Sequence, residues 1–374
     1  MSSEKPWFVL AGGGTGGHLY PGLAVAESVQ TLQPDFEVSV FGTSRPIDAK
    51  LTKPRGYELV RQQVQPFPNR PWRWPGFLAA YFRSVKYARQ RFAHRRPAVV
   101  LGLGGYAAAP PIVAALKLGI PTAIFNPDAV PGRANRRLGP RVDRVFVQWD
   151  DTARMFKNAR GEIMCTGCPV RPAFARATRK KACQALKLAP DLNTILITGA
   201  SQGAHSINAA VMELFDLWSV AKDWQIIHLT GEADLKTCRR KYKENDVKAR
   251  VYAFTEHMAY CMAAADIVVS RAGASSLAEI TAMGLPSVLM PYPFDKKQHQ
   301  LANAKVLVGN GAAALVEDVN DPKVNARRLK EELKAIMRSD ESRRRMARSA
   351  GALGRIDAAD VIAEELFEIA RRDN

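Results

Sequence analysis

The sequence predicts an α/β protein of two Rossmann-like domains, each built around a parallel sheet. The chain has 374 residues, more than one ordinary hydrophobic core accommodates, so two domains are expected. Short apolar runs alternate with helical segments in both halves, which is typical of parallel sheets. A glycine-containing loop follows the first strand of each half, at Gly12–His18 and at Gly199–Ala204. Together these observations favour two nucleotide-binding-type domains in tandem.

Apolar runs predict the strands of the first half. They are expected at residues 7–11, 37–41, 98–101, 122–125 and 144–147. The loop Gly12–His18 leads into a helix that we expect to start at Pro21, because proline is favoured in the first helical turn. A second glycine-rich loop, Gly102–Tyr106, follows the third of these strands.

The second half begins after a break near Gly167–Pro172 and a basic segment at Arg176–Lys181. Its strands are expected at residues 194–198, 224–228, 251–254, 267–270 and 287–291. One helical stripe near the end of the chain comprises Ala359, Ile362, Leu366 and Ile369. We therefore predict a first domain at 1–168, a second at 169–354, and a helix within 355–374 that packs back on the first domain.

Composition indicates a cytosolic protein with an anionic partner. The 54 basic and 36 acidic residues give a net charge of +18, which favours anionic lipid, nucleic acid or a phosphorylated substrate. No RNA-binding or zinc-finger motif occurs, so we expect no nucleic-acid partner. No apolar run reaches the length of a membrane span, and the N-terminus lacks a secretory segment. Cys165 and Cys168 have no second pair to complete a zinc site, so we expect free thiols and no metal.

Residues 270–304 carry the most informative pattern. A glycine- and serine-containing helix entry is followed one turn later by Glu279, and a polar His299-Gln300 pair follows the strand-like run. A helix N-terminus presents N–H donors to a phosphate, and a carboxylate on the same face can accept both hydroxyls of a ribose. The pattern suits a nucleotide-activated donor, although an ordinary capped helix has the same local signature.

The loop Gly12–His18 is a second candidate site. Its N–H groups could hold an anion, but no acidic residue ends the second strand, so a dinucleotide fingerprint is disfavoured. His18 is the one titratable side chain in the loop, and a neutral imidazole suits a general base near pH 7. A helix-capping histidine is the structural alternative. Arg171, at the expected domain boundary, could neutralise a diphosphate.

An aromatic segment, Pro71–Lys86, stands apart from these loops. Its bulky residues fall at helical spacing among arginines and lysines, as on helices that lie on a membrane surface. A helix facing the protein core has the same periodicity, so both interpretations stay open from the pattern alone. The membrane-facing candidates are Trp72, Trp74, Phe77, Leu78, Tyr81 and Phe82.

In their order along the chain, these motifs resemble the bacterial peptidoglycan N-acetylglucosaminyltransferases of the MurG type, which have the two-domain GT-B fold with the domains facing across a cleft. The motifs are Gly13–His18 with Pro21–Ala24, Gly104–Tyr106, Val130–Gly132, Pro169–Arg171, Ser201–Ala204, His228–Gly231, Arg271–Ala274 with Ala278–Ile280, and His299-Gln300 with Asn303-Ala304. Each motif is weak by itself, but the ordered set spans nearly the whole chain.

The resemblance implies an activity in peptidoglycan synthesis. GlcNAc would pass from UDP-GlcNAc to the 4-hydroxyl of MurNAc on undecaprenyl-pyrophosphoryl-MurNAc-pentapeptide, with inversion at the anomeric carbon and without a cofactor. The enzyme would act as a peripheral protein at the cytoplasmic face of the cell membrane, on an anionic surface. An inverting transfer needs one in-line displacement and one base on the acceptor hydroxyl, and His18 is the implied base.

The resemblance also implies which residues contact each substrate. Glu279 is expected at the uridine ribose, the backbone near Thr255 at the uracil, and His299 with Gln300 at the GlcNAc hydroxyls. The full donor set is Thr15, Gly16, Gly17, Asp128, Arg171, Ser201, Gln202, Thr255, Arg271, Ala272, Gly273, Ser275, Glu279, His299 and Gln300. The acceptor set is Gly14, Thr15, Gly104, Gly105 and Tyr106.

The chain departs from the family at three places. Phe125-Asn126-Pro127-Asp128 stands where the family usually has His-Glu-Gln-Asn, Cys168 replaces an Asn, and Ala200 replaces a Gly. We expect Asp128 to take over the polar role of the family's Asn, and either His18 or Asp128 to be the base. The alternatives are a related transferase acting on a diacylglycerol lipid, or a nucleotide-sugar-binding protein with impaired catalysis.

Overall fold

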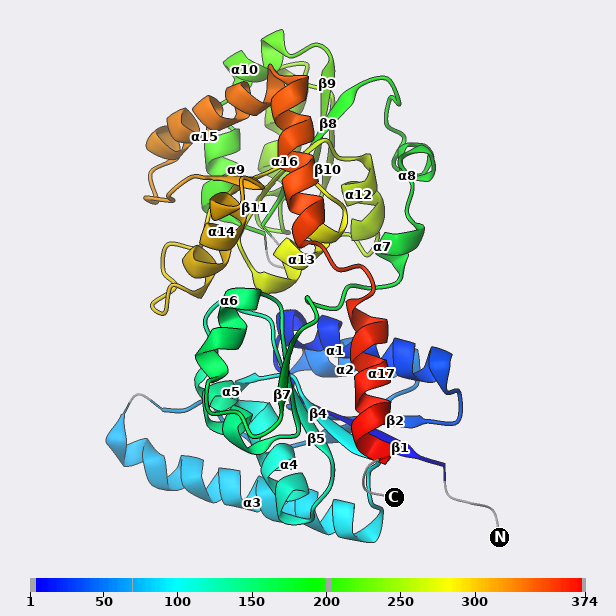
Figure 1. Ribbon diagram of the computed structural model, residues 1–374. Helices are drawn as coiled ribbons and strands as arrows, with labels where there is room; N and C mark the ends of the chain where they lie inside the picture. The colour runs from blue at the N-terminus through cyan, green and yellow to red at the C-terminus, as the bar shows by residue number, and fades with distance from the viewer. Residues whose placement is uncertain (1–4, 69, 200–202, 372–374) are drawn as a thin grey trace. The chain divides into compact units, whose positions relative to one another are not determined.

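The computed structural model describes residues 5–68, 70–199 and 203–371, which form two compact units (Figure 1). The first unit comprises the described residues up to Arg171 together with those from Asp357 onward, and the second runs from Pro172 to Ile356. Each unit contains a parallel sheet covered by helices. The predicted fold class, two α/β domains with parallel sheets, is therefore confirmed.

Among the described residues, the sheet of the first unit has seven strands in the order β3-β2-β1-β4-β5-β6-β7. The strands are β1 (Trp7–Ala11), β2 (Glu37–Gly42), β3 (Glu58–Arg61), β4 (Val99–Gly102), β5 (Thr122–Asn126), β6 (Arg144–Val147) and β7 (Glu162–Cys165). The interior strand β1 is buried at every position, because helices cover both faces of the sheet. Its register with β4 pairs Leu10 with Leu101.

The helices of the first unit connect these strands, except for α17, which follows the second unit in the chain. They are α1 (Gly16–Leu32), α2 (Pro46–Thr52), η1 (Lys53–Arg55), η2 (Pro71–Arg73), α3 (Trp74–His94), α4 (Gly105–Lys117), α5 (Arg133–Leu138), η3 (Gly139–Arg141), α6 (Asp150–Ala153), η4 (Arg154–Phe156) and α17 (Ala358–Arg371). The core beneath them includes Phe41, Phe92, Ile112 and Ile124, all at most 1% exposed.

The second unit repeats this architecture. Its described strands lie in the order β10-β9-β8-β11-β12-β13. They are β8 (Asn193–Thr198), β9 (Trp224–Leu229), β10 (Ala249–Tyr252), β11 (Ile267–Ser270), β12 (Ser287–Leu289) and β13 (Ala313–Leu315). The helices are α7 (Ala173–Arg176), α8 (Arg179–Leu186), α9 (His205–Val211), α10 (Phe215–Val220), α11 (Leu235–Glu244), α12 (Met258–Ala264), α13 (Ala274–Ala282), α14 (His299–Gly309), α15 (Pro322–Met337) and α16 (Asp340–Leu353).

Two expectations about local structure were wrong. The first helix begins at Gly16, not at Pro21, so Gly16 to His18 form its first turn rather than part of a loop. The Leu19 amide donates to the Thr15 carbonyl at 3.2 Å, which closes that turn before the proline is reached. The strand expected at residues 251–254 lies at 249–252 instead, where β10 pairs with β9 from Ala249 to Tyr252.

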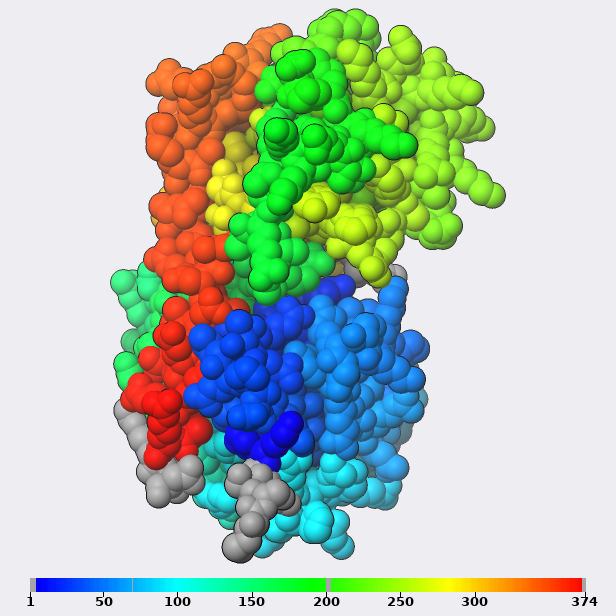
Figure 2. Space-filling view, turned by 90° about the vertical axis from the view of Figure 1, so that its right-hand side faces the viewer, coloured from blue at the N-terminus to red at the C-terminus, as the bar shows by residue number. Residues whose placement is uncertain are grey.

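The C-terminal helix α17 packs on the first unit. Its stripe residue Ile362 is fully buried, and Phe367 contacts Phe36 with ring centroids 5.3 Å apart. The Arg144 guanidinium on β6 forms an ion pair with Glu365 of this helix at 3.1 Å. Figure 2 shows the red atoms of α17 bordering blue atoms from the first part of the chain.

Candidate functional site

In the first unit, His18 lies in the first turn of α1 and is held by Thr15. Thr15 is the N-cap residue, and its Oγ1 lies 2.9 Å from His18 Nδ1. If Nδ1 carries the proton and donates to Oγ1, the opposite nitrogen Nε2 is left as the acceptor. Thr15 makes no side-chain capping hydrogen bond to the helix, and its hydroxyl orients the imidazole instead.

The two glycine-rich loops of the first unit lie against each other. A Cβ atom added at Gly105 would lie 3.6 Å from His18 Cε1, and one added at Gly14 would lie 3.2 Å from the Tyr106 hydroxyl. Gly14 and Gly105 have φ values of +85° and +72°, a region that side chains rarely adopt. The structure thus brings the predicted acceptor residues of both loops to the imidazole.

Asp48 organises the first loop, and sequence reasoning missed it. Its fully buried carboxylate accepts hydrogen bonds from the Gly14 amide at 2.7 Å and from the amide and hydroxyl of Thr43 at 2.7 and 2.8 Å. Arg45 Nη1 donates to the Gly14 carbonyl at 2.9 Å, so the peptide groups on both sides of Gly14 are fixed. Asp48 and Gly14 are 34 residues apart in the chain, so no local sequence motif predicts their contact.

The electrostatic surroundings of His18 favour the neutral imidazole. Burial lowers the pKa of His18 below its ordinary value, while the negative charge of Asp128 acts in the opposite direction and raises it in part. The position of His18 in a helical first turn also disfavours the imidazolium. A neutral imidazole beside a carboxylate is suited to accept a proton near neutral pH.

Asp128 follows β5, where the chain departs from the family motif. Asn126 is buried, and its Nδ2 donates to the Asp128 carbonyl at 2.7 Å. Asn135 Nδ2 donates in turn to Asn126 Oδ1 and to the Phe125 carbonyl, both at 3.0 Å. Phe125 is 2% exposed and belongs to the core, so it offers no polar group to a ligand.

Arg171 belongs to the first unit by its contacts. Its guanidinium carbon lies 5.1 Å from the centre of the Tyr20 ring, two residues after His18 on α1. The structure thus brings a cationic group to the first two turns of α1, where a developing anion could be stabilised.

In the second unit, β11 leads through Arg271–Gly273 into α13. Gly273, which has no side chain, is the N-cap residue, and the first turn of this helix carries no acidic residue. Ser275 and Glu279 are partly buried and four residues apart, on one face of the helix. Asn303 Nδ2 donates to the Ala272 carbonyl at 3.3 Å, which ties α14 to this helix entry. The geometry suits a phosphate at the helix entry and a hydroxylated group at Glu279.

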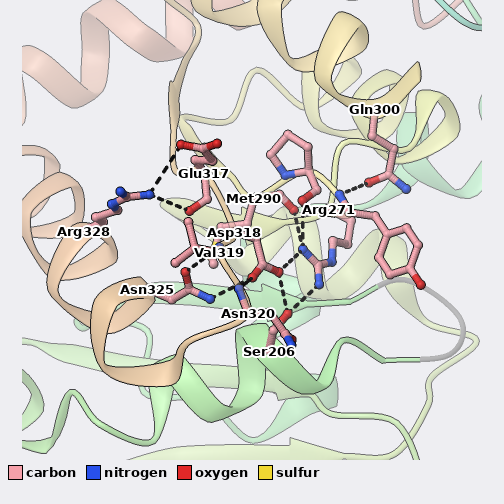
Figure 3. A network of polar contacts seen from close by, with 12 residues as sticks. Ser206, Arg271, Met290, Gln300, Glu317, Asp318, Val319, Asn320, Asn325 and Arg328 are labelled. Carbon is pink, nitrogen blue, oxygen red and sulfur yellow. Dashed lines mark hydrogen bonds and ion pairs between the residues drawn. The ribbon is translucent and has the colours of Figure 1, made fainter. Parts of the chain in front are cut away.

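The Arg271 side chain lies in a buried network of polar contacts (Figure 3). Its Nη1 lies 2.8 Å from Asp318 Oδ2, and its Nη2 donates to Ser206 Oγ at 2.7 Å. Burial alone would raise the pKa of Asp318, but hydrogen bonds, the first from Ser206, outweigh it and hold the pKa below its ordinary value. Sequence reasoning missed both Ser206 and Asp318.

The His299-Gln300 pair begins α14 and is attached to the loop that precedes it. Gln300 Oε1 accepts from the Tyr292 amide at 3.0 Å, and the Gln300 amide donates to Asp295 Oδ2 at 3.1 Å. His299 is partly buried, and its Nδ1 has no hydrogen-bond partner within the described part of the chain. Asp295 therefore occupies this helix N-terminus, which leaves the α13 entry as the better anion site of the two.

The remaining predicted donor residues are placed as follows. The Thr255 hydroxyl, in the loop after β10, accepts from the His257 amide at 3.0 Å. Ser201 and Gln202 lie outside the described residues. No described group of three or more His, Cys, Asp or Glu side chains is arranged to hold a metal ion.

The spacing of η2 and α3 left open a membrane-surface helix or a helix facing the protein core. Some of their bulky residues are buried and others are exposed. Val85 and Phe92 are buried and face the unit, where α3 runs beside α4 (Figure 1). Trp72 and Phe82 are exposed by 69% and 62%. The other predicted residues, Trp74, Phe77, Leu78 and Tyr81, are exposed or partly buried. None of the helices in the described ranges is long and apolar enough to span a membrane.

Family models match both halves of the chain. Residues 8–147 match the glycosyltransferase family 28 N-terminal domain, and residues 194–362 match the glycosyltransferase family 28 C-terminal domain.

Curated relatives match over nearly the full length. A protein of Desulforamulus reducens is 35% identical, with 95% of this chain and 96% of the relative covered. One of Sorangium cellulosum is 38% identical, with 97% and 88% covered. Both carry the name UDP-N-acetylglucosamine-N-acetylmuramyl-(pentapeptide) pyrophosphoryl-undecaprenol N-acetylglucosamine transferase.

Solved structures share the fold. The crystal structure of MurG from Acinetobacter baumannii superposes with a TM-score of 0.74 at 25% identity, covering 97% of this chain and 99% of that one. A UDP-GlcNAc 2-epimerase of Neisseria meningitidis has a TM-score of 0.70 at 16% identity, covering 97% and 100%, which shows the fold alone.

Proposed function

The chain belongs to glycosyltransferase family 28, and we propose that it transfers GlcNAc from UDP-GlcNAc to the 4-hydroxyl of MurNAc on undecaprenyl-pyrophosphoryl-MurNAc-pentapeptide. It is a glycosyltransferase with the GT-B fold. The observation that carries the proposed reaction is the full-length similarity to relatives named for this reaction, at 35–38% identity. Their shared name favours the peptidoglycan acceptor over a diacylglycerol lipid.

In this mechanism the first unit binds and activates the acceptor, and the second unit binds the donor. In the first unit, His18 removes the proton from the acceptor hydroxyl while the glycine-rich loops bind the acceptor pyrophosphate. In the second unit, the α13 entry and Ser275 bind the donor diphosphate and Glu279 binds the ribose. The hydroxyl oxygen attacks the anomeric carbon as the bond to UDP breaks, and the negative charge gained by UDP is stabilised by N–H donors at the helix entry.

The orientation of His18 and the retained Glu279 support catalysis over mere nucleotide-sugar binding. A binding protein has no use for an imidazole fixed through Thr15 beside the acceptor loops. Asp128 stands where the family has an uncharged residue, and its charge acts on the His18 pKa. We infer that His18 is the base and that Asp128 stabilises the imidazolium formed on proton transfer.

The reaction is tested by UDP release from UDP-GlcNAc, measured with and without a lipid-pyrophosphoryl-MurNAc acceptor. We expect turnover only when that acceptor is present, because the in-line displacement requires its hydroxyl. A diacylglycerol acceptor and UDP-glucose serve as matched alternatives for acceptor and donor. UDP release that is independent of the acceptor, or turnover with diacylglycerol alone, would contradict the proposed function.

We further propose that the exposed face of η2 and α3 binds the anionic cytoplasmic surface of the cell membrane. Trp72 is exposed beside Arg70, whose guanidinium carbon lies 5.3 Å from its ring centre. Arg137 and Arg141 act electrostatically on Tyr81, which brings positive charge from α5 and η3 to the same helix. Exposed aromatics surrounded by cations are typical of proteins that lie on anionic lipid.

Replacing Trp72 and Phe82 together by serine is expected to weaken binding to anionic vesicles roughly a hundredfold. The estimate takes about 1.4 kcal/mol for each large apolar side chain that enters the interface. Vesicles of phosphatidylglycerol and phosphatidylcholine in a flotation assay provide the measurement. Val220→Ser in the second unit is the matched control, because Val220 is 74% exposed. Equal binding of the double variant and the wild type would exclude this surface.

A further inference from the structure

We propose that Arg271 and Asp318 are positioning residues, which set the spacing between α9 and the loop before α14, to which Gln300 bonds, and make no contact with the donor diphosphate. The inference rests on the proposed function, because it concerns how the nucleotide-sugar site is held together. The two side chains form a buried ion pair of 2.8 Å, in which Arg271 is 9% and Asp318 0% exposed.

The Arg271 guanidinium joins three segments of the second unit (Figure 3). Its Nη1 donates to the carbonyls of Met290 and Pro291, at 2.9 and 3.1 Å, directly after β12. Its Nη2 donates to Ser206 on α9, the helix that begins at His205. One planar, rigid group therefore fixes the end of β12 relative to the start of α9.

Asp318 completes the network from the segment after β13. Its Oδ2 accepts from Ser206 Oγ at 2.6 Å in addition to Arg271, and its Oδ1 accepts from the Asn320 amide at 2.9 Å and from Asn325 Nδ2 at 2.8 Å. Both carboxylate oxygens are thus used within the protein. A charge buried in this way is costly to leave unpaired, so the pair holds Arg271 in one orientation.

This network reaches Gln300 through the adjoining loop. Pro291, held by Arg271, precedes Tyr292, whose amide donates to Gln300 Oε1 at 3.0 Å. The Tyr292 ring centre also lies 5.7 Å from the guanidinium carbon. A displacement of Arg271 would therefore move the loop residue Tyr292 that holds the Gln300 side chain.

The same contacts argue against a direct phosphate contact from Nη1. Its two hydrogens are shared among three protein oxygens, on Met290, Pro291 and Asp318. This edge of the guanidinium has no donor left for a ligand, whereas Gly273 at the α13 entry has no side chain that could cap the helix. The helix entry can bind the diphosphate without the arginine.

The test compares Arg271→Met, Asp318→Asn and the double variant with the wild type. Affinities for uridine, UDP and UDP-GlcNAc are measured together with kcat and KM for GlcNAc transfer. We expect each single variant to lower kcat/KM about a hundredfold, as an ångström-scale misplacement does. The double variant should be no worse than either single one, and the ratio of UDP to uridine affinity should stay at the wild-type value.

A direct role of Arg271 at the diphosphate would give another pattern. Arg271→Met would then lower the ratio of UDP to uridine affinity, while Asp318→Asn, which keeps the cation, would preserve that ratio and add its own independent loss. That result would overturn the inference. A wild-type protein that binds no uridine diphosphate would instead contradict the proposed function, so the two failures are distinguishable.

Ser206→Ala extends the test should Asp318→Asn fail to fold, because it removes only one hydroxyl from the network. We expect a loss of about tenfold in kcat/KM with the same unchanged ratio of affinities. Ser219→Ala is the matched control, since Ser219 is an exposed serine on α10 that bonds only the Asp216 carbonyl among the described contacts. Full activity of Ser206→Ala would contradict the positioning role.

Discussion

Replacing His18 by glutamine is expected to lower kcat for GlcNAc transfer by a factor of about 10²–10⁴, with little change in either KM. This is the usual contribution of a positioned general base, and glutamine keeps a polar group of similar length near Thr15. Because the loss is confined to the transition state, kcat and kcat/KM should fall together. Steady-state kinetics with saturating donor and acceptor provide the measurement.

His94→Ala is the control for this substitution, because His94 is an exposed histidine at the end of α3, away from the glycine-rich loops. It should keep wild-type turnover. A His18→Gln variant that kept its kcat and lost only acceptor affinity would show that the imidazole binds substrate and does not act as the base.

The pH profile separates His18 from Asp128 as the base. The Asp128 charge raises the pKa of His18 against the effect of burial, so Asp128→Asn should lower that pKa further. Activity requires the neutral imidazole and is lost as pH falls through its pKa. The acid limb of kcat/KM should therefore move to lower pH, and the plateau should fall in part, because the imidazolium formed on proton transfer loses a stabilising charge. Loss of turnover at every pH would instead make Asp128 the base.

The parts of the fold that follow from local pattern were predictable from the sequence. β1, β6 and β11 occur at the predicted residues, because strands buried on both faces are continuous apolar runs. The edge strands β3 and β7 escaped prediction, since each exposes polar side chains and so lacks a continuous apolar run. The start of α1 was misplaced because Pro21 was interpreted as a first-turn residue.

The site divides in the same way. His18, Glu279 and the glycine-rich loops belong to short motifs, so they could be named from the sequence. Asp48 and Asp318 could not, because the groups they hold lie 34 and 47 residues away in the chain. The motif predicted the position of Arg271 but not the orientation of its side chain. That orientation depends on the buried Asp318 carboxylate, which only the fold brings beside it.

Replacing Glu279 by glutamine is expected to raise KM for UDP-GlcNAc roughly ten- to a hundredfold, with a smaller effect on kcat. Hydrogen bonds to a charged acceptor contribute about 1.5–3 kcal/mol, and glutamine offers one acceptor oxygen where the carboxylate offers two. Glu279 lies one turn beyond Ser275 on the same face of α13, so the residue that binds the ribose is fixed relative to the helix entry that binds the diphosphate.

If Glu279 binds the ribose hydroxyls, the Glu279→Gln variant should also respond differently to a donor that lacks one of them. With the 2′-deoxy analogue of the donor, the wild type should lose affinity, whereas Glu279→Gln should discriminate much less between the two donors. Glu331→Gln, an exposed substitution of the same kind on α15, should match the wild type with both. If Glu279→Gln still preferred the ribose donor by the wild-type factor, the carboxylate would not bind the ribose hydroxyls. Its contribution would then lie in holding the helix entry, and KM for both donors would rise equally.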